Sequence, residues 1–488
     1  MNFKMTQEQS DIEKAFLSGK NQIVKAGAGT GKTSTIKILA SQMEGLSGLY
    51  MAFNKMTAEE VKGHLPSSVQ SRTTHSLAYQ AIGHKYKDKL SRPQGKYVNV
   101  ALTPAEIARY FNIKAVESVR GVDIAIIVKA TLGRFECSAT DALNIKCVPR
   151  HLVKDLVDKA RERDEYASVD AGKIGRVVLE YAVKLWEGRK DVNSDVLITH
   201  DTYLKFFQLS QPQLGFDVIF ADEFQDANPC TLAIVENQKN CQIVAVGDSS
   251  QAIYQWRGSI NAMEIMGYDE YPLTQSFRFG QNVADVANSI LLGATDLILK
   301  GNPTNDTQVT TVDYDQPYTV IFRTNGSLLS RAVALITDGV SVNIQTNTYQ
   351  FCRKLEESAH LREGNMKKVK HEDLIGFKNW SELCEEAAND PELKRIVSMI
   401  NSNTHLKVLR LLKNYKTPAN PHVTLITAHK SKGNEYAQVV LDDDFPEISP
   451  EMATQDRNSL YVAATRAMKT LQLNSDLTRY ITSQCQTL

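Results

Sequence analysis

The sequence lacks an apolar run of the ~18 residues that a membrane-spanning helix needs, and its N-terminus lacks the apolar core of a signal peptide. We therefore expect neither a membrane anchor nor secretion, and a cytoplasmic location. Its seven cysteines are scattered and form no CxxC pair, which argues against a zinc or iron–sulfur site. The sequence also has no excess of positive or negative charge, because 56 acidic residues balance 56 basic ones. This balance excludes a uniformly basic surface, whereas a local basic groove stays compatible with nucleic acid.

The 488 residues exceed one ordinary domain, and short apolar runs alternate with segments of helical periodicity. This alternation predicts an α/β fold with parallel sheets. Strands are expected at Gln22–Lys25, Leu49–Phe53, Asp217–Ala221, Gln242–Val246, Thr319–Arg323, Val423–Thr427 and Ala437–Asp442. Two stretches, 86–199 and 346–418, break the rhythm, the first with amphipathic segments such as Leu152–Arg163 and Ile174–Trp186. We expect both stretches to be mainly helical insertions.

A glycine-rich segment, AGAGTGKT, follows the first expected strand and precedes a helix-like segment. Strand, glycine loop and helix in this order are what a P-loop requires, and a chance glycine-rich turn is disfavoured because both flanks fit. Backbone N–H groups of the loop can face phosphates, Lys32 can reach the β- and γ-phosphates of a nucleoside triphosphate, and the Thr33 hydroxyl can bind Mg²⁺. The predicted nucleotide-binding residues of the loop are Ala26, Gly27, Ala28, Gly29, Thr30, Gly31, Lys32 and Thr33.

Two further strands end in residues that complete such a site. Asp222 follows the apolar run FDVIFA, at the sheet edge where parallel sheets bind ligands, and is predicted to hold Mg²⁺ together with Thr33. Glu223 is placed to orient and deprotonate the attacking water. A helix N-cap is the alternative for this acidic pair, and the accompanying P-loop disfavours it. Gln251, after the strand at 242–246, can sense the γ-phosphate through its amide.

Aromatic and basic residues follow Gln251 within the segment GDSSQAIYQWRG. Tyr254 and Trp256 offer flat faces on which bases can stack, and Arg257 can hold a backbone phosphate. The alternative is that both aromatic residues belong to the core. Their position in a loop that begins Gly-Asp-Ser-Ser favours contact with nucleic acid.

These motifs resemble, in their order and over nearly the whole chain, those of the UvrD/Rep/PcrA family of superfamily 1 helicases. The resemblance is carried by MTQEQ, AGAGTGKT, MAFNKMTAEEV, RTTHSLAY, DEFQD, VGDSSQAIYQWRG, LTQSFRFG, VIFRTN, VTLITAHKSKGNEY and NSLYVAATRAM. It implies that Gln9 reads adenine, that Phe277 stacks on adenine in place of the usual tyrosine, and that Glu435 contacts the ribose. It also implies two arginine fingers, Arg278 and Arg466, which neutralise charge on the transferring phosphoryl group.

The same resemblance implies two RecA-like domains with ATP and Mg²⁺ between them. Domain 1A would comprise 1–85 and 200–275, and domain 2A 276–345 and 419–488, with 86–199 as insertion 1B and 346–418 as a reduced insertion 2B. The implied contacts with single-stranded DNA are Phe53, Asn54, Lys55, Thr74, His75, Tyr254, Trp256, Arg257, Thr427 and His429. The stretch ITHDTYLKFF, residues 198–207, further resembles the helicase portion of F-box DNA helicases.

The expected function is therefore ATP-driven movement along single-stranded DNA, 3′ to 5′ by resemblance, with unwinding where single strands meet duplex. A role in DNA repair, recombination or replication is implied, and a monomer is compatible with it. Two alternatives stay open: a translocase that strips proteins from single strands, which suits a small 2B, and an ATP-switched DNA-binding subunit. Retention of Lys32, Glu223, Arg278 and Arg466 argues against the second. A P-loop kinase or GTPase is disfavoured by the long separation of AGAGTGKT from DEFQD.

Overall fold

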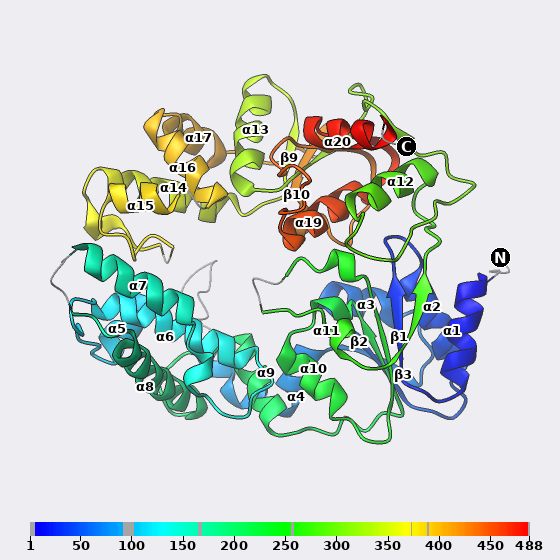
Figure 1. Ribbon diagram of the computed structural model, residues 1–488, viewed down its shortest axis with the longest axis horizontal. Helices are drawn as coiled ribbons and strands as arrows, with labels where there is room; N and C mark the ends of the chain where they lie inside the picture. Colours follow the sequence, from blue (N-terminus) through cyan, green and yellow to red (C-terminus); the bar gives the residue numbers. More distant parts are fainter. Residues whose placement is uncertain are drawn as a thin grey trace.

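Two six-stranded sheets of parallel strands form the framework of the chain (Figure 1). The computed structural model describes residues 5–90, 102–163, 168–254, 258–371, 373–387 and 390–486. The first sheet has the order β3-β2-β4-β5-β1-β6, with β1 Gln22–Ala26, β2 Gly48–Ala52, β3 Val69–Thr73, β4 Val218–Asp222, β5 Gln242–Gly247 and β6 Asp269–Leu273. The second has the order β7-β12-β11-β8-β10-β9, with β7 Gln308–Val309, β8 Tyr318–Phe322, β9 Val342–Ile344, β10 Val423–Thr427, β11 Tyr436–Leu441 and β12 Ala467–Gln472.

The central strands are buried on both faces, which explains why they read as continuous apolar runs. In β4, Val218 and Phe220 pack into one core cluster, while Ile219 and Ala221 pack into another on the opposite face. This alternation follows from the two-residue period of a strand. The α/β fold with two parallel sheets, predicted from the sequence, is confirmed.

The seven strands expected from the sequence are present, and their ends differ from the prediction by at most one residue. The five strands that the sequence did not predict are β3, β6, β7, β9 and β12, and all but β12 lie at a sheet edge. Edge strands bury less surface and need no apolar run, as the sequences VQSRT of β3 and DEYPL of β6 show. The inner strand β12, AMKTLQ, alternates apolar and polar residues too weakly to be recognised.

Helices connect the strands of each sheet. Those beside the first sheet are α1 Gln7–Leu17, α2 Lys32–Ser41, α3 Lys55–Lys62, α4 Thr74–Ala81, α9 His200–Leu209, α10 Pro229–Glu236 and α11 Ala262–Ile265. Those beside the second are α12 Gln281–Ile290, α13 Asn325–Thr337, α18 Ala428–Ser431, α19 Thr454–Ala464 and α20 Ser475–Gln486. None of the described helices combines the length and the apolar composition that crossing a membrane would require.

Two groups of helices lie at the left of Figure 1, and the second of them shares an apolar core with the second sheet. The first, between β3 and β4, comprises α5 Pro104–Tyr110, α6 Gly121–Glu136, α7 Arg150–Arg163 and α8 Ala171–Lys190. It has its own apolar core, in which Val128 and Leu132 of α6 and Val178 and Leu185 of α8 are buried. The second, between β9 and β10, comprises α14 Thr348–Arg362, α15 Trp380–Glu386, α16 Pro391–Asn401 and α17 His405–Leu412. The helices expected at 152–163 and 174–186 are confirmed as parts of α7 and α8.

The two helical groups also contact each other directly. The Arg120 guanidinium donates to the carbonyl of Gly376 at 2.7 Å, and Lys159 pairs with Glu386 at 3.1 Å. The Lys159–Glu386 ion pair is exposed, with 41% and 46% of the two side chains accessible. Exposed ion pairs of this kind contribute roughly 0–1 kcal/mol each, so the contact is weak compared with the buried cores.

Candidate nucleotide site and single-strand surface

The glycine loop lies between the end of β1 and the start of α2, as the P-loop motif requires. Gly29 and Gly31 have φ angles of 73° and 82°, in the left-handed region that favours glycine. A Cβ atom on Gly29 would lie 2.7 Å from Cβ of Arg278 and from Oγ of Ser276. Glycine is therefore required both by the backbone and by the close approach of the segment that follows β6, and the loop keeps the open backbone that phosphates need.

Lys32, at the start of α2, forms an ion pair with Glu223, which directly follows β4. Burial raises the pKa of Asp222, and its carboxylate accepts a hydrogen bond from the Tyr50 hydroxyl. Burial opposes ionisation of Glu223 as well, but the charges of Lys32 and Lys432 outweigh it and hold the Glu223 pKa below the ordinary value. Glu223 is thus ionised, as a general base must be at the start of a reaction.

The backbone of Glu223 is itself unusual. Its φ of 52° and ψ of 38° place it in the left-handed region, where a residue with a side chain is held at a cost of roughly 1–3 kcal/mol. The Glu223 carboxylate that follows this turn pairs with Lys32. Thr33 follows Lys32 in the first turn of α2. The donors fit the expected ligands: a hydroxyl and a carboxylate suit Mg²⁺, and the glycine loop with Lys32 suits a triphosphate.

Two arginines face this cluster from elements of the second sheet. Arg278 donates to the carbonyl of Thr465 at 3.0 Å and pairs with Glu435 at 2.7 Å. Arg466 is buried and lies 3.4 Å from the amide oxygen of Gln251. Burial, and then the charge of Arg278, lower the pKa of Arg466 to about 9. The charge of Arg466, disfavoured by burial and by the neighbouring guanidinium, would be stabilised by an anion such as phosphate.

The side of the loop predicted to hold the base is occupied by Gln9 and Phe277. The Gln9 amide accepts from the N–H of Thr6 at 3.0 Å and donates to the Thr35 hydroxyl at 3.2 Å, which fixes its orientation. The Phe277 ring is 43% exposed, and a Cβ on Gly31 would lie 3.5 Å from it and 3.8 Å from the Gln9 amide nitrogen. Both side chains therefore border the glycine loop, with an open aromatic face available for stacking.

Lys432 is a buried cation that the sequence did not single out. Its ammonium group pairs with Asp226, lies 3.5 Å from Glu223, donates to the carbonyl of Gln251 at 2.8 Å and sits 5.5 Å from the centre of the Tyr254 ring. Burial opposes its charge, and Asp226 and Glu223 outweigh burial, so its pKa lies above the ordinary value. Its signal was its place in VTLITAHKSKGNEY, a segment already recognised for other residues.

Tyr461 and Asp248 form a second connection that the sequence did not single out. The Tyr461 hydroxyl accepts from the backbone N–H of Ala28, in the glycine loop, and donates to the Asp248 carboxylate, both at 3.0 Å. Tyr461 lies on α19 beside the second sheet, and Asp248 follows β5 of the first. The buried Tyr461 hydroxyl therefore links two parts of the first sheet, the glycine loop and Asp248, to α19 beside the second sheet.

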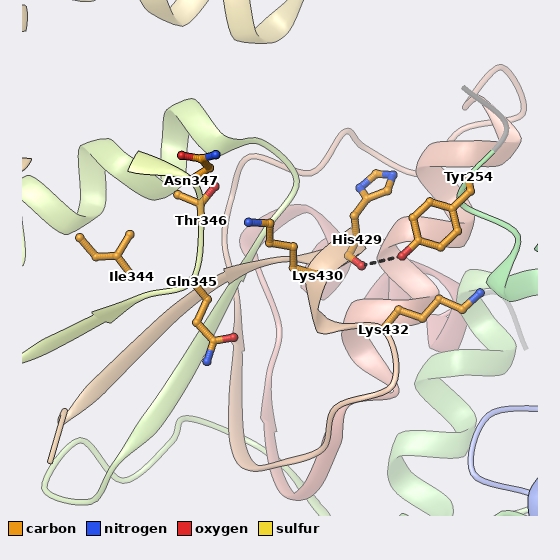
Figure 2. A pocket seen from close by; sticks show the side chains of 8 residues that line it. All are labelled: Tyr254, Ile344, Gln345, Thr346, Asn347, His429, Lys430 and Lys432. Atoms are coloured by element: carbon orange, nitrogen blue, oxygen red, sulfur yellow. Dashed lines mark hydrogen bonds between the residues drawn. The ribbon is translucent and has the colours of Figure 1, made fainter. Parts of the chain in front are cut away.

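The aromatic residues predicted to bind a single strand come together. The rings of Phe53 and Tyr254 stack with centres 5.4 Å apart and planes 21° apart. The Tyr254 hydroxyl donates to the carbonyl of His429 at 3.2 Å, shown as a dashed line in Figure 2, and the His429 ring lies 3.0 Å from the carbonyl of Ile253. Residues after β2, β5 and β10 thus meet at one surface, next to Lys432.

The other residues predicted to contact single-stranded DNA have different surroundings. His75 pairs with Asp201 at 3.2 Å, and the Asn54 side chain caps α3, whose first residue is Lys55. Thr74 and Thr427 are buried, so their side chains offer little surface to a strand. Trp256 and Arg257 lie outside the described residues.

Comparison with known proteins also points to helicases. Residues 5–266 match the UvrD/REP helicase N-terminal domain, and residues 422–473 match the UvrD-like helicase C-terminal domain. The chain is 30% identical to F-box DNA helicase 1 of Gallus gallus, covering 97% of the chain and 49% of that protein. It is 31% identical to F-box DNA helicase protein 1 of Schizosaccharomyces pombe (99% and 58%), and 22% identical to ATP-dependent DNA helicase PcrA of Leuconostoc citreum (55% and 37%). The chain spans about half the length of the curated relatives it matches.

Proposed function

Because this chain belongs to the UvrD/REP helicase family, we propose that it hydrolyses ATP to move along single-stranded DNA and to separate duplexes. The observation that carries the proposal is Lys432. This one ammonium group touches the acidic cluster that faces Lys32 and also lies under the Tyr254 ring of the strand surface. A change at the nucleotide is therefore transmitted to the strand surface through direct contact.

The proposed chemistry uses residues from both sheets. Glu223 takes a proton from a water molecule whose oxygen attacks the γ-phosphorus, while the bond to the β-phosphate oxygen breaks and releases ADP and phosphate. Lys32, Arg278 and Arg466 neutralise charge on the phosphoryl group. Thr33 and Asp222 would hold Mg²⁺, which supplies further neutralisation when bound.

Movement would follow from closure of the cleft between the two sheets. Gln251 lies against Arg466, and three residues further on Tyr254 contacts Phe53 and His429. Binding of ATP favours the arrangement in which the arginines and the glycine loop share the triphosphate, and loss of phosphate releases it. Stacking on Phe53 and Tyr254 would be worth roughly 1–3 kcal/mol per base and tolerates any sequence, as a translocase needs.

We further propose 3′-to-5′ movement and a role in DNA repair, recombination or replication, on the basis of the motif spellings. The test is strand displacement from duplexes with a 3′ tail, a 5′ tail or blunt ends, in the presence of ATP and Mg²⁺. We expect displacement from the 3′-tailed duplex alone, and none with Lys32→Ala. Displacement from the 5′-tailed duplex alone would reverse the polarity. Hydrolysis stimulated by single strands without displacement of any duplex would favour the protein-stripping translocase instead.

A further inference from the structure

A pocket of about 650 Å³ adjoins the strand surface (Figure 2). Tyr254 and His429 form one wall of the pocket, and residues that follow β9 form the other. Apart from Ile344 the lining is polar, and Thr346 and Asn347 lie on the side towards which Lys430 extends. The pocket therefore continues the surface already proposed to hold a single strand, and it contains residues to which no role has been given.

The topology explains why these segments meet. The strands β9 and β10 are parallel neighbours, with Ile344 opposite Leu425, so their carboxyl ends lie at the same edge of the second sheet. The N–H of Gln345 donates to the carbonyl of Leu425 at 2.9 Å, which holds the first turn after β9 against β10. The short helix α18 follows β10 directly and carries Lys430. Both walls of the pocket are thus fixed by the sheet.

Lys430 differs from two less exposed lysines near it. Lys432 pairs with Asp226, and Lys354 pairs with Asp373 at 3.0 Å, whereas Lys430 forms no ion pair with any described residue. Burial lowers the pKa of Lys430. The Lys430 side chain is exposed, so its ammonium group can reach an anion that enters the pocket, and no carboxylate of a described residue is paired with it.

Acidic residues do lie nearby, in a larger cavity of about 1180 Å³ that Lys430 also lines. Their charges are largely committed: Asp373 and Glu392 pair with Lys354, and Glu386 pairs with Lys159. In Figure 2 the Lys430 side chain extends towards Thr346 and Asn347, away from Tyr254 and Lys432. The side of the cavity that Lys430 faces is therefore neutral and polar.

We propose that Lys430, assisted by the side-chain amide of Asn347, binds a backbone phosphate of single-stranded DNA next to the position occupied by Tyr254 and His429. Lys430 supplies the charge. The side-chain oxygen Oδ1 of Asn347 accepts from the backbone N–H of Gln350 at 3.2 Å, which leaves the side-chain NH₂ group of Asn347 as a donor. The contact recognises the charge of a phosphate and not the identity of a base, so it suits single-stranded DNA that moves past the site. This inference rests on the proposed function, because it extends the same strand path.

The expected effect is that of one phosphate contact. For single strands, the slope of log affinity against log salt falls by about 0.7 for each phosphate contact that is lost. The affinity at low salt should fall roughly three- to tenfold, as for one charge-assisted hydrogen bond at a partly exposed site. Strands too short to reach the pocket should show neither change.

The experiment measures fluorescence anisotropy of labelled oligo-dT of increasing length at several KCl concentrations. Wild type is compared with Lys430→Gln and Lys430→Arg, and Lys469→Gln serves as the matched control because Lys469 is an exposed lysine on β12 of the same sheet. Thermal melting checks that each variant is folded. We expect Lys430→Gln to lose affinity and salt slope on long strands, Lys430→Arg to retain both, and Lys469→Gln to match wild type.

Two results would overturn the inference in distinguishable ways. If wild type binds single strands and Lys430→Gln binds them with the same affinity and salt slope, Lys430 contacts no phosphate and this inference alone is lost. If wild type binds no single strand of any length, the proposed function is lost together with it.

Discussion

Replacement of Lys432 by methionine tests how strongly the two sheets are coupled through one buried charge. Methionine keeps the length and apolar volume of the lysine stem and removes only the ammonium group. The Lys432 side chain is 9% exposed, and the side chain of its partner Asp226 is fully buried. Without Lys432, the Asp226 carboxylate loses the charge that it faces, and its second oxygen has no hydrogen-bond partner among the described atoms.

Breaking a buried ion pair by removal of one partner costs about 3–5 kcal/mol. Burial already raises the pKa of Asp226 to about 6 while Lys432 opposes this rise. The lost attraction therefore acts on a carboxylate that can become neutral by taking up a proton, and we expect the cost near the lower end of that range at pH 8. The free energy of unfolding should fall accordingly, and stimulation of ATP hydrolysis by single strands should be lost with it.

The assay is urea denaturation followed by circular dichroism, with Lys469→Met as the matched control on an exposed lysine. The double variant Lys432→Met with Asp226→Asn should recover roughly 1–3 kcal/mol relative to Lys432→Met, because it removes the orphaned carboxylate. A change within about 0.5 kcal/mol of wild type for Lys432→Met, as for an ordinary surface substitution, would refute the reasoning.

Three further predictions address the remaining site and the second sheet. Glu223→Gln should keep nucleotide affinity within a few-fold and lower turnover by about 10²–10⁴-fold; loss of binding of a fluorescent nucleotide would give Glu223 a structural role instead. Tyr461→Phe should lower the free energy of unfolding by about 1–3 kcal/mol and weaken ATP binding, since the Ala28 N–H and the Asp248 carboxylate lose their shared hydroxyl. The control Tyr110→Phe, on an exposed ring, should match wild type. Equal affinities of the two variants for ATP would contradict the role of the Tyr461 hydroxyl. Burial, and then Asp444, raise the pKa of Asp442 to about 6, so the folded chain loses stability as the pH rises from about 4 through 6. Asp442→Asn should therefore stabilise by about 1 kcal/mol at pH 8, after allowance for partial exposure, and by little at pH 4; a gain that does not change with pH would count against this.

The glycine loop and the acidic pair Asp222–Glu223 could be predicted because each motif is contiguous and its chemistry is set locally. The central strands could be predicted for the same reason, since burial on both faces leaves a continuous apolar run. Residues such as Lys432 and Tyr461 could not, because their roles arise only when the sheets dock. Lys432 meets Asp226 across 206 positions of sequence, and Tyr461 meets Ala28 across 433.

The edge strands and the pocket at β9 show the same limit. The strand β9 has three residues and no apolar run that distinguishes it from a loop. Its position beside β10 is nevertheless what brings Asn347 close to Lys430. In the sequence Asn347 and Lys430 are 83 positions apart, and only the parallel register of the two strands places them in one pocket.

The central claim, a motor in which ATP hydrolysis is coupled to a single strand, is tested most directly by steady-state ATP hydrolysis with and without single-stranded DNA. Lys32→Ala serves as the control for hydrolysis by any other enzyme. The account predicts low hydrolysis without DNA, a large rise when single strands are added, and none in Lys32→Ala under either condition. A rate that single strands leave unchanged, in a preparation that binds both ATP and the strand, would contradict the coupling.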